Sequence, residues 1–262
     1  MSAYRRKLLS RAINRLYTSF ITKFKQKTFG NDENRVKYIF YSSKETSKVL
    51  VVCFPAFAGK GAKYNYIRTL SEFKLNKLFL LDDIGGTIDR GNYLIKAGVE
   101  NNVKELIQSF INKYQPHTII FFGSSKGGYS ALNFSLYFKN IYVCIAAPQY
   151  YLADYLIKTG KDDNLRTILC NDINPESIKR LNNRLKEKLN QSNNRPSAVY
   201  IHYSDMEHTY KEHIVDLIDD IKRNNINIKE DVEHYLNHTD LVYYFPDYLR
   251  KCIKEILKDH HP

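Results

Sequence analysis

Short apolar runs of strand character alternate, from residue 36 to residue 257, with longer stretches whose apolar residues recur every three or four positions. Several of the short runs are apolar almost throughout, which is typical of strands buried within a parallel sheet. Strands are predicted at 36–42, 48–54, 78–81, 118–122, 141–146, 198–203 and 226–232, and helices at 64–73, 99–114, 126–138 and 241–257. This alternation predicts an α/β fold in which a mostly parallel sheet carries helices on both faces.

Residues 149–196 depart from this alternation because they are polar and helix-prone throughout. A helix start is marked there by Asn174 and Pro175, residue types that are preferred as the helix N-cap and the first helical residue. We expect this segment to be a helical cap inserted into a single domain that covers residues 31–262.

Residues 1–30 are expected to form a basic amphipathic helix. They hold eight basic residues and no acidic one. Their apolar side chains recur at spacings of three and four, which places them on one helix face: Leu9, Ile13, Leu16, Phe20 and Phe24. Such a helix either packs on the domain with its charged side chains in water or lies on an anionic membrane surface. Peripheral contact with a membrane is therefore an open hypothesis.

The balance of charge favours an anionic partner. Lysine and arginine number 40 against 28 acidic residues, which gives a net charge of +12. Eight of these positive charges lie in residues 1–30 and no nucleic-acid recognition motif is present, so nucleic acid is not an expected partner. The four cysteines form no C-x-x-C pair and the N-terminal segment lacks the pattern of a secretion signal. We therefore expect buried thiols and a cytoplasmic protein without a membrane span.

The chemistry is predicted to lie where the strand at 118–122 meets the following helix. The chain reads Gly123-Ser124-Ser125-Lys126-Gly127 there, which is the G-x-S-x-G pattern of a nucleophile elbow in the strand–turn–helix setting that the elbow requires. The serine has to sit in a tight, strained turn, and side chains two positions away on either side would collide with neighbouring backbone. Ser125 is the predicted nucleophile and Ser124 its structural neighbour.

A serine nucleophile needs an adjacent base that is oriented by a third group. In a fold with this elbow the partners follow in the order serine, acid, histidine, each after a strand. Asp205 follows the strand at 198–203 and is predicted to be the acid, and His238 follows the strand at 226–232 and is predicted to be the base. The alternatives are Glu207 or Asp172 as the acid and His234 or His208 as the base. No metal is predicted, because the histidines lie in no metal-binding motif and have no cysteine nearby.

An oxyanion hole requires two hydrogen-bond donors. The backbone N–H of Lys126, directly after the nucleophile, is one predicted donor. The loop after the strand at 48–54 supplies the other, for which Phe57 is the first candidate and Ala56 the second. The same part of the chain carries three basic residues that either bind phosphate or form a solvated face: Lys60, Lys63 and Arg68.

Four short segments share their letters, order and spacing with a known family: 121–132 (FFGSSKGGYSAL), 147–149 (APQ), 203–205 (YSD) and 237–238 (NH). They resemble bacterial polysaccharide O-acetyltransferases of the α/β-hydrolase fold, over about residues 36–250. The resemblance implies transfer of acetyl from acetyl-CoA to a sugar hydroxyl of an anionic capsular polysaccharide through an acetyl-serine. It implies the same roles for Ser125, Asp205 and His238. Residues 1–30 have no counterpart in the resemblance, and their contact with the inner membrane or a capsule-assembly complex is a separate hypothesis.

Two other functions remain open at this stage. A carbohydrate esterase or deacetylase uses the same triad, because water and a sugar hydroxyl attack the same acyl-enzyme. A non-catalytic member that binds glycan or serves as a scaffold keeps the geometry of the elbow without the reaction.

Overall fold

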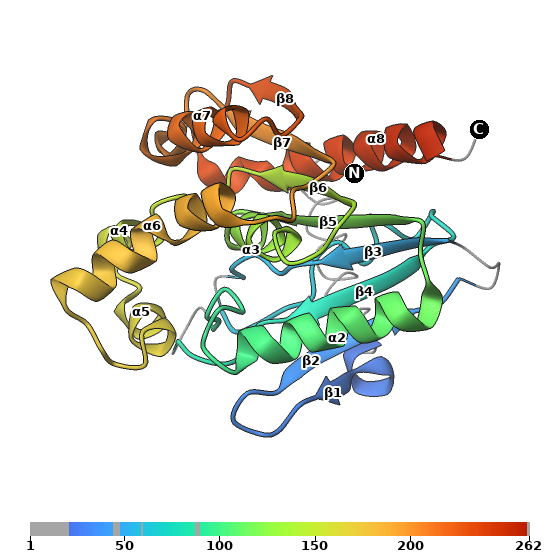
Figure 1. Ribbon diagram of the computed structural model, residues 1–262, viewed down its shortest axis with the longest axis horizontal. Helices are drawn as coiled ribbons and strands as arrows, with labels where there is room; N and C mark the ends of the chain where they lie inside the picture. Colours follow the sequence, from blue (N-terminus) through green and yellow to red (C-terminus); the bar gives the residue numbers. More distant parts are fainter. Residues whose placement is uncertain (1–20, 44–47, 59, 87–89, 261–262) are drawn as a thin grey trace, which may run out of the picture.

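The computed structural model describes residues 21–43, 48–58, 60–86 and 90–260. Within these residues the strands form one eight-stranded sheet in the order β1-β2-β4-β3-β5-β6-β7-β8 (Figure 1). The strands are β1 (Lys27–Phe29), β2 (Val36–Tyr41), β3 (Val49–Cys53), β4 (Asn76–Leu81), β5 (Thr118–Ser124), β6 (Ile141–Ala146), β7 (Ala198–Ser204) and β8 (Ile228–Glu233). The pairs β1–β2 and β2–β4 are antiparallel and every later pair is parallel, so the predicted mostly parallel α/β sheet is confirmed.

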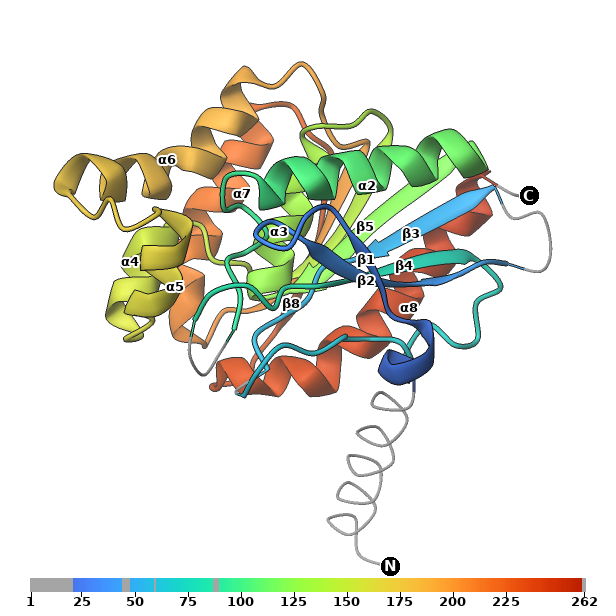
Figure 2. The ribbon, with the colours of Figure 1, turned by 90° about the horizontal axis from the view of Figure 1, so that it is seen from below.

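Helices cover both faces of this sheet, as the alternating pattern predicts. They are α2 (Val99–Tyr114), α3 (Lys126–Ser135), α4 (Leu152–Lys158), α5 (Asp162–Ile168), α6 (Pro175–Gln191), α7 (Val215–Arg223) and α8 (Leu241–His260), with the short turns η1 (Tyr210–Ile214) and η2 (His238–Asp240). In Figure 2, α2 and α3 lie on one side of the sheet and α8 crosses the other. The described helices include none that is long and apolar enough to cross a bilayer.

The buried core divides into two layers because successive side chains of a strand point to opposite faces. In β3, Leu50 and Val52 belong to the layer beneath α2 and α3, whereas Val49 and Val51 belong to the layer beneath α8. All four are almost fully buried. A strand buried on both faces has to be apolar at every position, which is why 48–54 reads as a continuous apolar run.

Two predicted helices differ from the structure. Residues 64–73 form a chain of turns in which Tyr66 has a φ of 61°. Four of the apolar side chains there recur at every third position, a spacing that successive tight turns also satisfy. These four are buried in the layer beneath α8: Tyr64, Ile67, Leu70 and Phe73. Within the predicted helix 1–30, residues 21–25 are helical but Lys27–Phe29 form the edge strand β1, and residues 1–20 lie outside the described part.

The segment 149–196 folds into α4, α5 and α6 between β6 and β7, grouped at one end of the sheet (Figures 1 and 2). The predicted start of α6 is confirmed, because the Asn174 side chain caps the helix by accepting a hydrogen bond from the Ser177 amide at 2.9 Å. The Asn164 side chain of α5 donates to the Gly91 carbonyl at 2.6 Å. This bond connects the helical segment to the loop that follows β4.

Candidate active site

The turn between β5 and α3 has the geometry of a nucleophile elbow. Ser125 adopts a φ of 52° and a ψ of −120°, an unusual backbone conformation for a residue with a side chain. A Cβ added at Gly123 would lie 2.5 Å from the Gly127 carbonyl carbon, and one at Gly127 would lie 2.3 Å from the Phe54 carbonyl oxygen. Both positions therefore require glycine because backbone approaches them closely.

His238 lies against Ser125 although 113 residues separate the two in the sequence. Its Nε2 is 2.9 Å from the Ser125 Oγ. His238 opens η2, directly after the loop that follows β8, and its side chain is 22% exposed. The geometry thus brings together the two residues that the sequence predicts as nucleophile and base.

The acid that contacts His238 is Glu207, and the prediction that Asp205 fills this position is wrong. Glu207 Oε1 lies 2.9 Å from His238 Nδ1, whereas Asp205 Oδ1 lies 2.8 Å from Nδ1 of the exposed His234. The Asp205 amide still donates to the Glu233 carbonyl and so continues the β7–β8 ladder. The strand ends at Ser204, Asp205 and Met206 form the turn that follows, and the Glu207 carboxylate then points back toward His238.

The Glu207 carboxylate is enclosed by protein. Its side chain is fully buried, and the Thr209 hydroxyl donates a hydrogen bond to Oε1, the same oxygen that faces His238. Within the described residues, Oε2 has no hydrogen-bond partner. Glu207 Oε1 is therefore held between the Thr209 hydroxyl and the His238 imidazole.

Gln149 is a further contact of the nucleophile. Its side-chain amide donates to the Ser125 Oγ at 2.9 Å, and its Oε1 accepts a hydrogen bond from the Tyr93 hydroxyl at 3.3 Å. Gln149 is completely buried, directly after the end of β6. Gln149 belongs to the 147–149 segment that resembles the family, but no local pattern in the sequence indicates that it faces the elbow.

The loop after β3 lies beside the elbow, as the predicted oxyanion hole requires. The Phe54 amide donates to the Phe122 carbonyl of β5 at 2.9 Å. The Ala56 amide donates to the Asn65 side chain at 3.0 Å, so this second candidate donor is already engaged. The Phe57 amide makes no such bond to the described residues, and the Lys126 amide lies in the first turn of α3, where no intrahelical acceptor exists.

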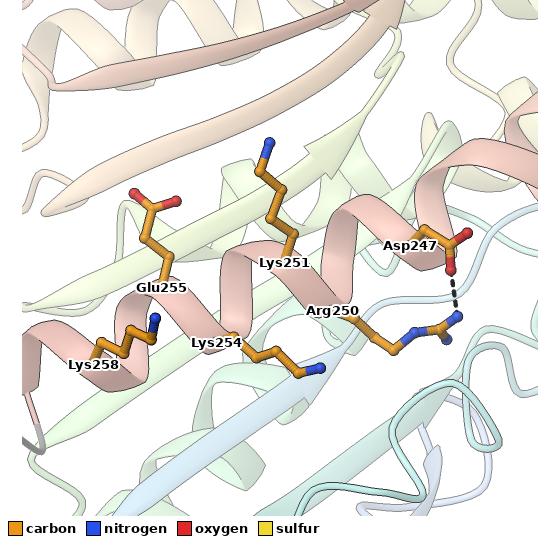
Figure 3. A pocket seen from close by; sticks show the side chains of 6 residues that line it. All are labelled: Asp247, Arg250, Lys251, Lys254, Glu255 and Lys258. Atoms are coloured by element: carbon orange, nitrogen blue, oxygen red, sulfur yellow. Dashed lines mark hydrogen bonds and ion pairs between the residues drawn. The ribbon is translucent and has the colours of Figure 1, made fainter.

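The other predicted binding residues lie at the surface. Lys60, Lys63 and Arg68 are exposed on the segment after β3. Among the described residues there is no group of three or more side chains that could hold a metal ion. A charged groove of about 450 Å³ runs along α8 and contains none of the residues above (Figure 3). Its lining side chains are Asp247, Arg250, Lys251, Lys254, Glu255 and Lys258.

Comparison with solved structures identifies the fold. No protein-family model matches the sequence, and no curated protein is similar to it. The structure is similar to the capsule O-acetyltransferase of Neisseria meningitidis serogroup A, with a TM-score of 0.71 and 23% identity over 87% of this chain and 94% of that one. It is also similar to a fluorophosphonate-binding serine hydrolase of Staphylococcus aureus, with a TM-score of 0.59 and 11% identity over 88% and 97% of the two chains. The chain therefore has the fold of the α/β serine hydrolases.

A third similar structure is a glycosylation-associated protein complex of Streptococcus agalactiae. Its TM-score is 0.73 and its identity 14%, over 90% of this chain and 47% of that chain.

Proposed function

We propose that this protein is a serine-dependent O-acetyltransferase that moves acetyl from acetyl-CoA to a sugar hydroxyl of an anionic capsular polysaccharide. The observation that carries the proposal is the continuous hydrogen-bonded series from Glu207 through His238 to Ser125 at a strained turn. The likeness to a capsule O-acetyltransferase, one of whose structures is a histidine-to-alanine variant in complex with CoA, supports acetyl-CoA as the donor.

In the first half-reaction His238 acts as a general base. Its Nε2 takes the Ser125 proton while Oγ attacks the thioester carbonyl, and Glu207 stabilises the imidazolium that forms. The negative charge on the carbonyl oxygen is held by the Lys126 and Phe57 amides. When the tetrahedral intermediate collapses, the carbon–sulfur bond breaks, His238 returns the proton to the sulfur, and CoA leaves as its thiol.

In the second half-reaction the same residues work on the acetyl-serine. His238 takes the proton of the acceptor hydroxyl, whose oxygen attacks the ester carbonyl within the same oxyanion hole. Collapse breaks the bond to Ser125 Oγ, which recovers its proton from His238. The product is an acetylated sugar, and the enzyme returns to its starting state.

Two parts of the chain are proposed to select donor and acceptor. Lys60, Lys63 and Arg68 are proposed to bind the CoA phosphates, because they are exposed cations on the segment that follows the oxyanion loop. The helices α4 to α6 are proposed to act as the cap that keeps water from the acetyl-serine. The proposal includes a cytoplasmic location and peripheral contact of residues 1–30 with the inner membrane.

The deciding experiment is mass spectrometry after brief exposure to acetyl-CoA. Wild-type protein is expected to gain the mass of one acetyl group on the peptide that contains Ser125, and Ser125→Ala is expected to gain none. An adduct of equal yield on both proteins, or none on a folded wild type that releases CoA, would contradict the acetyl-serine mechanism.

A carbohydrate esterase is the second candidate, which the likeness to a serine hydrolase favours. The two functions differ in what removes the acetyl group. Release of CoA that accelerates when an acidic capsular polymer is added indicates transfer, whereas release that is independent of the polymer indicates hydrolysis.

A further inference from the structure

The Lys126 side chain carries its charge into the protein interior. Its ammonium lies 2.6 Å from Asp82 Oδ2, and both side chains are only 1% exposed. Burying two charges carries a desolvation penalty of several kcal/mol per ion, so a buried pair is weak evidence for stability. This pair lies directly beside the nucleophile, and a function other than stability explains its position better.

The carboxylate of Asp82 is held from a second direction. Both of its oxygens accept a hydrogen bond from the Asn92 amide, at 2.9 and 3.0 Å. Gly91 lies directly against the pair, because an added Cβ there would lie 2.5 Å from the Lys126 Nζ and 2.6 Å from Asp82 Oδ2. The end of the lysine side chain is therefore fixed between the end of β4 and the loop that follows it.

The same ammonium also contacts the oxyanion loop. It lies 5.1 Å from the centre of the Phe57 ring, within the range of a cation–π contact. The ring has two further contacts: the Tyr93 ring centre is 5.6 Å away and the Lys161 ammonium lies 4.7 Å from the Phe57 ring centre. Lys126 thus joins the two segments from which the oxyanion donors are expected, one through its own backbone and the other through the Phe57 ring.

We propose that the ion pair between Lys126 and Asp82 is a positioning device for the oxyanion hole. The pair fixes the Lys126 amide and the Phe57 loop relative to Ser125, so that both N–H groups point at the developing negative charge before the reaction begins. The inference rests on the proposed function, because it takes these two amides as the donors. Asp82 and the Lys126 side chain are positioning residues and touch no reacting atom.

A charged pair fits this task better than apolar side chains do. Oxyanion donors have to lie about 2.7–3.1 Å from the oxygen they stabilise, and the loss of one donor lowers kcat by about 10²–10³-fold. An ion pair whose carboxylate also accepts a bifurcated hydrogen bond from one backbone N–H fixes both distance and direction, whereas apolar contacts are non-directional.

The test separates positioning from stability with three variants: Lys126→Met, Asp82→Asn and the double variant. Each single variant leaves one buried charge without its partner and is expected to lower the unfolding midpoint, whereas the double variant removes both charges and recovers much of that loss. The inference predicts that kcat for an aryl acetate stays reduced by roughly 10- to 100-fold in the double variant while KM changes little. The labelling rate by a fluorophosphonate probe is expected to fall in parallel.

The neighbouring ion pair between Lys37 and Asp83 provides the matched control. The Lys37 Nζ–Asp83 Oδ2 distance is 2.7 Å, close to that of the Lys126–Asp82 pair, and Asp83 also follows β4. Lys37 lies on β2, however, and this pair is partly exposed. Lys37→Met/Asp83→Asn is expected to leave kcat unchanged. Wild-type kcat in the Lys126→Met/Asp82→Asn protein would overturn the inference, as would an equal loss of kcat in the control.

A milder variant keeps the inference testable if the double variant does not fold. Phe57→Leu preserves the backbone amide but removes the ring that the Lys126 and Lys161 ammonium groups contact, and Phe57→Tyr preserves the ring. The inference predicts a reduced kcat for leucine and recovery for tyrosine, and equal activities would refute it. Ser125→Ala separates failure of the proposed function from failure of this inference. If Ser125→Ala remains active, the proposed function fails. If Ser125→Ala is inactive but the positioning variants keep wild-type activity, this inference alone fails.

Discussion

The identity of the catalytic acid is the sharpest test of the site, because two carboxylates two positions apart make different contacts. The fully buried Glu207 side chain places Oε1 2.9 Å from His238 Nδ1. The Asp205 carboxylate instead contacts His234 at the surface. Glu207→Gln removes the negative charge but preserves the shape, so Oε1 still accepts from His238 and from Thr209. The expected result is a large loss of kcat with little change in KM, since the imidazolium forms only during the reaction.

The size of this loss follows from the electrostatics. Two unit charges about 3–4 Å apart attract each other by about 4–6 kcal/mol at an effective dielectric constant near 20. Each 1.36 kcal/mol changes a rate tenfold, so Glu207→Gln is expected to lower kcat by about 10³–10⁴-fold. Asp205→Asn removes a pair whose histidine is 68% exposed, and surface pairs contribute little, so its effect is expected to stay below about threefold.

The assay is hydrolysis of an aryl acetate, which reports the triad without requiring the natural acceptor. Unfolding midpoints of both variants serve as the control for folding. The reasoning is refuted if Asp205→Asn loses as much activity as Glu207→Gln, or if folded Glu207→Gln keeps kcat within about threefold of wild type.

Three further predictions concern the surroundings of the triad. Gly127→Ala is expected to destabilise the protein by about 3 kcal/mol or more in urea unfolding, because its Cβ would lie 2.3 Å from the Phe54 carbonyl oxygen, whereas Gly128→Ala, at 3.2 Å from its nearest contact, stays within about 1 kcal/mol. Gln149→Leu removes one hydrogen bond to the nucleophile, and we expect aryl acetate hydrolysis to fall roughly tenfold without loss of folding. Burial lowers the pKa of His213 in the folded protein to about 4, whereas its ordinary pKa is 6.5. As the pH falls, His213 therefore takes up a proton in the unfolded chain before it does so in the folded protein. From about pH 7.5 to about pH 5 the wild type should therefore lose about 2 kcal/mol more unfolding free energy than His213→Asn; equal losses would contradict the assignment.

Local features of the fold can be predicted from the sequence because interactions between residues close together in the chain determine them. The α2 helix spans the predicted residues 99–114, and β6 spans the predicted residues 141–146. The elbow belongs to the same class, since its strand, its strained serine and its two close-approach glycines lie within a few residues of one another. The turns at 64–73 were misread because a spacing of three is common to helices and to successive turns.

The contacts that complete the site are long-range, and sequence spacing does not determine them. Gln149 reaches Ser125 only because β5 and β6 are neighbours and end at the same edge of the sheet. The apolar run that predicts β7 ends at Tyr203, yet the strand continues to Ser204 and the Asp205 amide still donates to the Glu233 carbonyl, so that Asp205 and Met206 form the turn. One additional residue of strand pairing determines that Glu207, and not Asp205, contacts His238. No local sequence pattern indicates where this pairing ends.

The sequence does contain a pattern that indicates the buried Lys126 ion pair. Lys126 is the only charged residue between 118 and 138, a stretch that is otherwise apolar or uncharged. A charge in such a stretch needs a buried partner, because an unpaired buried ammonium is too costly to retain. Its partner, Asp82, also ends an apolar strand. Parallel strands end at the same edge of a sheet, and only β3 separates β4 from β5. An acid at the end of one apolar strand and a lone lysine just after the end of another are therefore a pattern that predicts an ion pair beside the site.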